Sequence, residues 1–275
     1  MFYSLIIMSS LLTSAFTYHV PRNVSPFVRS FSKLTSKMDK HTDSKIQKKY
    51  YAKSEGQVKY KQALYDKFIN LIVCDGPAGS GKTSLACDFS LDMLKNKNAQ
   101  KIIITRPTIS IEEDLGYLPG NINKKMHPWT IPIFDVFLEY FSQSELDFYI
   151  RENIIEICPL GFIQGRTFKN SIIIADEMQN STPGQMFMLL TRIGENSKMI
   201  LNGDLKQTCQ EGNGLQDFIN KINNKYDSYQ DNIHNHETDN FNSILYQDGI
   251  SLVHLKEDDI QRHEMVKKII DIYQK

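Results

Sequence analysis

The stretch VCDGPAGSGKTSLACDF, Val73 to Phe89, carries residue types that bind a nucleoside triphosphate. It fits the pattern G-x-x-x-x-G-K-[ST] at every fixed position. Glycines in such a loop let backbone N–H groups turn toward phosphate oxygens. We expect Lys82 to neutralise the β- and γ-phosphates and the Thr83 hydroxyl to bind Mg²⁺. The predicted nucleotide-binding residues are Gly76, Pro77, Ala78, Gly79, Ser80, Gly81, Lys82 and Thr83.

Two acids follow an apolar run in IIIADE, Ile172 to Glu177. We expect Asp176 to hold Mg²⁺ through its water shell and Glu177 to polarise an attacking water. A hydrolase needs this second acid, whereas a P-loop kinase often lacks it because its nucleophile comes from the substrate. Another apolar run ends in NGDLKQ, whose Gln207 could reach the γ-phosphate or the lytic water. The same Asn-Gly-Asp sequence also forms good turns.

These residues need a scaffold that places the ends of several strands together. Short apolar runs alternate with longer helical or mixed stretches, and helices are predicted from Ser54 to Lys67 and from about Thr83 to Leu94. Such alternation predicts an α/β fold with a mostly parallel sheet and helices on both faces. Ligands then bind at the carboxyl ends of the strands. The predicted strands are Leu71–Cys74, Ile102–Thr105, Ile154–Ile157, Ile172–Ala175, Met199–Leu201 and Leu252–Leu255.

A length of 275 residues indicates one domain, alone or with appendages, and 41% hydrophobic residues are enough for a packed core. The formal net charge is 0. Residues 1–40 hold five basic residues and one acidic residue, so the remainder carries −4. Any nucleic-acid contact of the core must therefore come from local clusters of basic residues. The four cysteines lack metal-type spacing, so we predict reduced thiols and no zinc site for Cys74, Cys87, Cys158 and Cys209.

Residues 1–45 are predicted to be a targeting leader or disordered, outside the domain at 46–275. An apolar stretch with the length of a signal-peptide core precedes a segment rich in Ser, Thr and basic residues, which is transit-peptide composition. The pair resembles the bipartite leader of proteins sent to complex plastids. A mitochondrial or cytoplasmic location, a secretory signal and a membrane anchor are alternatives. We expect no stable membrane insertion after leader removal.

Residues 223–247 are polar and Asn-rich, and we interpret them as a loop inserted before the last strand. Asn224 to Asp227 matches N-K-x-D, the guanine-reading pattern of GTPases. That pattern must follow a buried strand, so we interpret the match as coincidental. His234-Asn235-His236 has no partner residues nearby in the sequence and is expected to be solvated.

Several blocks together resemble the PhoH family of P-loop ATPases, over roughly Lys53 to Tyr273. They are GPAGSGKTSLA, TRPT, LGYLPGNINKKMHP, PLGFIQGRTF, IIIADEMQNSTPGQMFMLLTRIG and KMILNGDLKQ. The resemblance implies a single RecA-like domain related to the first motor domain of superfamily 1 helicases. It also implies ATP hydrolysis linked to RNA metabolism and assembly into rings, often hexamers. No PIN nuclease segment accompanies the blocks, so no nuclease activity is expected.

The resemblance also implies roles for residues outside the glycine-rich loop and the acidic pair. Gln57 in SEGQVKY would contact the adenine edge. An arginine from a neighbouring subunit would stabilise the transition state, with Arg192 or Arg262 as candidates and Arg166 as a third. Nucleic-acid contacts are predicted at Arg106, Arg166 and Thr167. Further aromatic residues could stack on bases or pack in the core, close to Lys124 and Lys125: Tyr117, His127 and Trp129.

The sequence therefore predicts a Mg²⁺-dependent ATPase that acts on single-stranded RNA, with helicase-like remodelling as one form of that activity. An ATP-driven switch or adaptor without motor activity is the alternative, and a P-loop kinase is a further one.

Overall fold

The computed structural model describes residues 50–107, 131–207, 212–230 and 245–262, together with the isolated positions 265, 269 and 272. Several predictions lie outside these residues. They concern the leader at 1–45, the remainder of the polar insertion at 231–244, Tyr117, Lys124, Lys125, His127, Trp129, Cys209 and the triplet 234–236.

The core is a six-stranded sheet in the order β3-β2-β4-β5-β1-β6, and every neighbouring pair is parallel. This architecture is an α/β RecA-like P-loop fold, so the predicted fold class is confirmed. Each predicted strand overlaps an observed one, with ends shifted by at most two residues. The strands are β1 (Leu71–Asp75), β2 (Lys101–Thr105), β3 (Ile155–Ile157), β4 (Ser171–Ala175), β5 (Lys198–Gly203) and β6 (Ile250–His254).

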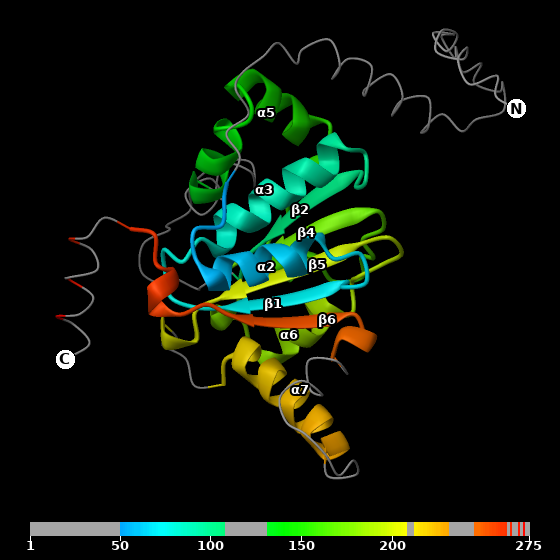
Figure 1. The fold of residues 1–275 in the computed structure, drawn as a ribbon. Coiled ribbons are helices and arrows are strands. Elements are labelled where there is room, and N and C mark those ends of the chain that lie inside the picture. Colours follow the sequence, from blue (N-terminus) through cyan, green and yellow to red (C-terminus); the bar gives the residue numbers. More distant parts are fainter. Residues whose placement is uncertain are drawn as a thin grey trace, which may run out of the picture. The chain divides into compact units, whose positions relative to one another are not determined.

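Helices cover both faces of the sheet because the strands are apolar on both sides (Figure 1). On one face, α6 (Pro183–Leu190) and α7 (Gly214–Gln230) pack over Val73, Ile103 and Ile173. On the other face lie α2 (Glu55–Tyr65) and α3 (Lys82–Lys95). A further helix, α5 (Gln143–Arg151), precedes β3. Short 3₁₀ turns follow the strands at η1 (Leu160–Phe162), η2 (Met178–Asn180), η3 (Leu205–Gln207) and η4 (Glu257–Asp259).

Helix ends agree with local sequence signals. The Ser54 hydroxyl accepts from the backbone N–H of Gln57 and starts α2, and Thr182 starts α6 with a capping box and Pro183 at its first turn. At the other end of α2, the Lys198 ammonium of β5 donates to the carbonyls of Leu64 and Asp66 at 2.7 and 2.6 Å. Burial lowers the pKa of Lys198 to about 8.

The prediction of a polar loop is wrong at residues 223–230, which continue α7. Phe218 and Ile222, one helical turn apart just before them, pack this helix on the core. Asn224 to Asp227 lies within this helix and does not follow a strand, so it lacks the setting of a guanine-reading motif.

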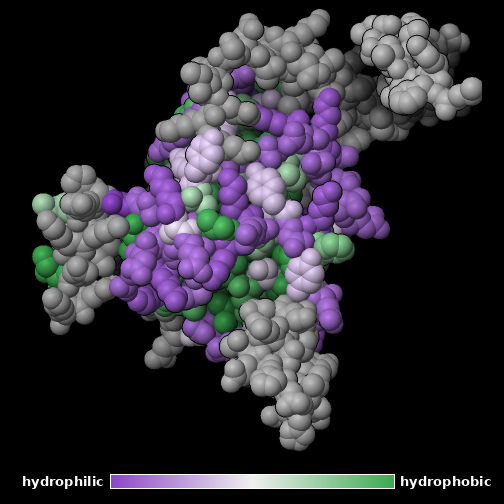
Figure 2. Space-filling view, in the orientation of Figure 1, coloured by the Kyte–Doolittle hydropathy of each residue, from purple (hydrophilic) through white to green (hydrophobic). Residues whose placement is uncertain are grey.

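Apolar side chains are largely enclosed by this arrangement. The face seen in Figure 2 is mostly hydrophilic, and hydrophobic residues appear on it only in small groups. Within the described residues, no helix combines the length and the apolar character needed to cross a membrane.

The sheet centre sets the stability of the domain. Ile173 of β4 is fully buried, so Ile173→Ala should lower the free energy of unfolding by about 2–5 kcal/mol through lost burial and a cavity. Phe187→Ala on α6 is the control, since that side chain is 70% exposed, and it should change the free energy by less than about 0.5 kcal/mol. Urea denaturation measures both. Equal losses would contradict the assigned core.

Candidate functional site

A cleft of about 420 Å³ opens where β1, β4 and β5 end. Its volume lies in the range of small-molecule sites. Residues from the P-loop, the acidic pair and the β5 end meet there, as the sequence predicted. The lining is Tyr50, Tyr51, Lys53, Gln57, Ala78, Gly79, Gly81, Lys82, Thr83, Ser84, Leu85, Asp176, Glu177, Gly203, Asp204, Gln207, Gln261 and Arg262.

The P-loop turns between β1 and α3 through two glycines in the left-handed region, Gly79 at φ 83° and Gly81 at φ 88°. Helix α3 starts at Lys82, so its positive N-terminal end faces the cleft. The Lys82 ammonium donates to the carbonyls of Gly76 at 2.6 Å and Pro77 at 3.0 Å. A cationic group and a helix N-terminus thus meet at one end of the cleft, which suits a polyphosphate.

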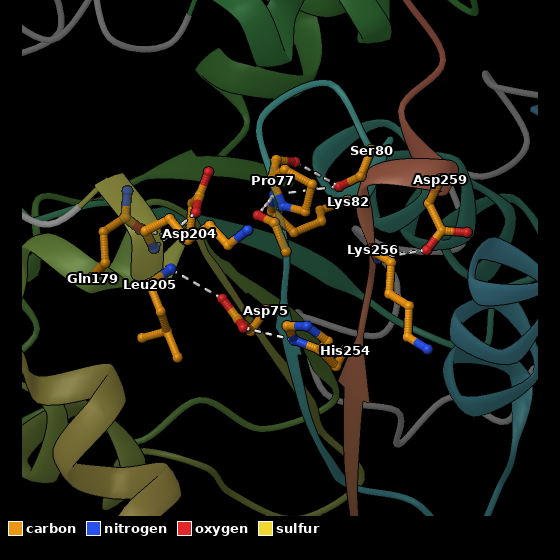
Figure 3. A network of polar contacts seen from close by, with 12 residues as sticks. Asp75, Pro77, Ser80, Lys82, Gln179, Asp204, Leu205, His254, Lys256 and Asp259 are labelled. Carbon is orange, nitrogen blue, oxygen red and sulfur yellow. Dashed lines mark hydrogen bonds and ion pairs between the residues drawn. The ribbon is translucent and has the colours of Figure 1, made fainter. Parts of the chain in front are cut away.

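The end of β5 holds the backbone of the P-loop (Figure 3). The N–H of Gly76 donates to the carbonyl of Gly203 at 3.1 Å, and the N–H of Ala78 donates to Asp204 Oδ2 at 3.0 Å. Asp75 adds a further tie, since its carboxylate accepts from the N–H of Leu205 at 3.0 Å. Hydrogen bonds to a carboxylate are among the stronger ones in proteins. Asp204 therefore does more than form the turn that its sequence indicated.

Gln57 lines the cleft, but its amide is engaged within the protein. Nε2 donates to the carbonyls of Ser80 at 2.9 Å and Asp259 at 3.2 Å, and Oε1 accepts from the N–H of Lys53 at 2.8 Å. Pairing with both N6 and N7 of adenine requires one free N–H on Nε2. Adenine recognition by Gln57 stays a prediction, and it requires Nε2 to leave one of its two carbonyls. In this structure Gln57 stabilises the P-loop through its hydrogen bond to the carbonyl of Ser80.

Asp176 and Thr83 face each other as the predicted metal-binding pair. The Thr83 hydroxyl donates to the Asp176 carboxylate at 3.1 and 3.2 Å. Burial, and after it the charge of Glu177, raises the pKa of Asp176. A divalent cation would favour the ionised form of this buried carboxylate, and carboxylate and hydroxyl oxygens are the ligands that Mg²⁺ takes. The residues present therefore fit the predicted cofactor.

Glu177 lies at the cleft with a left-handed backbone at φ 55°, a conformation that costs a non-glycine residue roughly 1 kcal/mol or more. Its carboxylate accepts from Gln179 Nε2 at 2.6 Å and lies 3.7 Å from the Arg106 guanidinium. The Gln179 amide oxygen accepts from the N–H of Asp204 at 3.0 Å. Gln179, buried and absent from the predicted site residues, thus links the predicted base to the segment that holds the P-loop. The sequence signal for Gln179 was its place in the segment DEMQ, Asp176 to Gln179, within one of the blocks that resemble the PhoH family.

The remaining predicted residues fall in different places. Gln207 in η3 lines the cleft beside Asp204, where a γ-phosphate sensor would lie. Arg262 also lines the cleft of its own chain. Arg192 follows the C-terminal end of α6 and does not line the cleft; its guanidinium donates to the carbonyls of Met188 at 3.0 Å and Arg166 at 3.3 Å.

Arg166 is engaged in a structural ion pair. Its guanidinium lies 2.6 Å from the Glu156 carboxylate of β3 and 3.2 Å from Cys158 Sγ. Thr167 next to it is exposed. A phosphate group would have to compete with Glu156 for Arg166, so the nucleic-acid contact predicted there remains a prediction.

Comparisons with known proteins agree with this geometry. The profile of the family described as PhoH-like protein matches residues 49–274. The PhoH-like protein of Bacillus subtilis (strain 168) is 36% identical over 223 residues, 81% of this chain and 63% of that protein. The PhoH-like protein of Synechocystis is 32% identical, over 88% of this chain and 70% of that protein. Protein PhoH of Escherichia coli (strain K12) is 40% identical, over 60% and 47%.

The chain belongs to the PhoH family. PhoH proteins are nucleotide-binding P-loop proteins, and the cleft contains the P-loop of this member. The matched part spans between about half and 70% of the length of these PhoH relatives.

The hydrogen bond from the N–H of Ala78 to Asp204, which fixes the PhoH P-loop, can be tested by mutation. Asp204→Ala removes the acceptor for the N–H of Ala78, so ATP affinity should fall about tenfold or more while the fold is retained. Asp147→Ala is the control, because Asp147 is exposed on α5 and does not line the cleft. Isothermal titration with ATP measures both. Unchanged affinity in Asp204→Ala would contradict the assigned hold.

Proposed function

We propose that the chain is a Mg²⁺-dependent ATPase whose turnover is stimulated by single-stranded RNA. The observation that carries the hydrolytic part is the meeting of Lys82, Thr83, Asp176, Glu177 and Gln207 at one cleft. Thr83, and Asp176 through the water shell, would hold Mg²⁺, which would neutralise phosphate charge.

In the proposed step, a water oxygen forms a bond to the γ-phosphorus of ATP. The bond from that phosphorus to the β–γ bridging oxygen breaks, and ADP leaves with the electron pair. Glu177 accepts the proton of the attacking water, and Lys82 holds the phosphates in line. Gln207 orients the γ-phosphate or the water by hydrogen bonding.

Arg106 supports the RNA part of the proposal. It follows β2 at the carboxyl edge of the sheet, and its guanidinium pairs with Glu177 at 3.7 Å. Both side chains are about one-third exposed, so the pair contributes little to stability and exchanges readily. An RNA phosphate that binds Arg106 would release the Glu177 carboxylate to act on water. RNA binding and hydrolysis would then be linked through one ion pair.

Two further parts of the proposal concern assembly, which is argued from the family resemblance, and location, which is argued from the leader. A ring of identical chains, often a hexamer in such proteins, would place several cleft-bearing domains around one RNA strand. The leader composition supports import into an organelle, with the plastid as the proposed destination.

Glu177→Gln tests the assigned base. Turnover should fall by about 10²-fold or more, because general-base assistance is lost, while ATP affinity is retained. Lys82→Ala should abolish ATP binding. Phosphate release and equilibrium binding of ATP distinguish the two. Normal hydrolysis by Glu177→Gln would refute the assignment of the base, and phosphate transfer to an added acceptor in place of water would indicate a kinase.

Arg106→Ala tests the proposed link to RNA. Wild-type turnover should rise several-fold with single-stranded RNA and lose part of this stimulation as salt increases, because phosphate contacts are screened. In Arg106→Ala the ratio of RNA-stimulated to basal turnover should approach one. Flat wild-type turnover with RNA would instead favour an ATP-driven switch that controls a protein partner.

A further inference from the structure

The chain that follows β6 folds back over the P-loop of the same chain. The N–H of Leu255 donates to the carbonyl of Asp75 at 2.8 Å, at the end of β1. Six residues later the N–H of Gln261 donates to the carbonyl of Gly79 at 3.0 Å. Between them, the carbonyl of Asp259 accepts from Gln57 Nε2 at 3.2 Å. Figure 3 shows Lys256 and Asp259 of this segment, joined by a hydrogen bond, together with Ser80 of the P-loop.

Two glycines lie directly against this segment, Gly56 of α2 and Gly79 of the P-loop. A Cβ on Gly56 would lie 2.3 Å from Asp259 Oδ2, and a Cβ on Gly79 would lie 2.3 Å from Arg262 Nε. Asp259 is itself 5% exposed, and its carboxylate accepts from the N–H of Lys256 at 2.6 Å. Gln261 and Arg262 at the end of this segment therefore line the nucleotide cleft, and Asp259 holds Gln57 beside it.

Arg262 brings a cation to this cleft. Its side chain runs along Gly79, with Cγ, Cδ and Nε all within 3 Å of the Cβ position there, and it lines the cleft with Lys82 and Thr83. Within the described part of the chain its guanidinium has no hydrogen-bond or ion-pair partner. Arg166 and Arg192, by contrast, are engaged with Glu156 and with backbone carbonyls. A guanidinium offers five N–H donors suited to phosphate oxygens.

We propose that Arg262 is a catalytic residue that acts in cis. Its guanidinium contacts the β- and γ-phosphate oxygens of the nucleotide bound by its own P-loop, and it stabilises the charge that develops as the γ-phosphoryl group is transferred to water. The inference rests on the proposed ATP hydrolysis. It replaces the expectation that a neighbouring chain supplies this arginine, and it makes the cleft complete within one chain.

Mixed assemblies separate action in cis from action in trans. Arg262→Ala alone should lower turnover by about 10³-fold or more, the range seen for arginines at phosphoryl-transfer sites. The 275-residue Arg262→Ala chain is then mixed with a differently tagged Lys82→Ala chain, which carries Arg262 but binds no nucleotide. Action in cis predicts turnover no higher than the sum of the two chains alone. Recovery of a substantial fraction of wild-type turnover, in assemblies that carry both tags, would overturn the proposal.

Binding of ATP gives a readout that does not depend on hydrolysis. In the same mixture only the Arg262→Ala clefts bind ATP, and their affinity should stay about tenfold below that of the wild type. If the wild type binds ATP without turnover, hydrolysis as the proposed function fails while this measurement still tests Arg262. Wild-type affinity and turnover in Arg262→Ala alone would overturn the inference.

Two controls complete the design. Arg151→Ala removes an exposed arginine of α5 and should leave turnover unchanged. Arg262→Lys keeps the charge but loses the forked donors, so it should recover ATP affinity more than turnover. If the chain is monomeric, loss of turnover in Arg262→Ala by itself supports action in cis, and normal turnover contradicts it.

Discussion

The backbone of the P-loop is fixed by hydrogen bonds from other segments, and the rest of the site depends on that constraint. Its glycines lose much conformational freedom on folding and have no side chains to pack. The carbonyl of Gly203 and the carboxylate of Asp204 hold one side of the loop. Gln57 and the N–H of Gln261 hold the other. These bonds offset the entropy cost and keep the phosphate end of the cleft preorganised.

The parallel sheet makes that hold possible. Strand β1 lies between β5 and β6. The P-loop that follows β1 therefore lies between the segments that follow β5 and β6, and both of them hydrogen-bond its backbone. Strand β4, on the far side of β5, delivers Asp176 and Glu177 to the same edge. Gln179 then joins Glu177 to the N–H of Asp204. One buried amide therefore connects Glu177 to the segment that holds the P-loop.

Much of this architecture could be predicted from the sequence. The apolar, β-branched runs marked all six strands, since a strand buried on both faces has few alternatives to such a composition. The P-loop and the acidic pair were recognisable because their chemistry demands fixed residue types at fixed spacing. The strand order β3-β2-β4-β5-β1-β6 could not be derived, because pairing between distant segments leaves no local signal.

Contacts between segments that are distant in the sequence could not be predicted either. Asn-Gly-Asp indicated a turn, and only the register of β5 beside β1 brings Asp204 to the N–H of Ala78. Gln57 was predicted to face a base, yet the return of the chain after β6 places a carbonyl of Asp259 at its amide. Arg262 was one of three candidates for an arginine that serves a neighbour, and the same return places it over Gly79. The polar stretch after Ile222 gave no sign that α7 continues to Gln230.

Amide hydrogen exchange of the full chain, with and without a non-hydrolysable ATP analogue and Mg²⁺, tests the central claim most directly. The claim is that three distant segments form one nucleotide cleft. It predicts that the analogue slows exchange together in the P-loop, at residues 203–207 and at residues 255–262. Protection confined to the P-loop, with the other two segments unchanged, would contradict it.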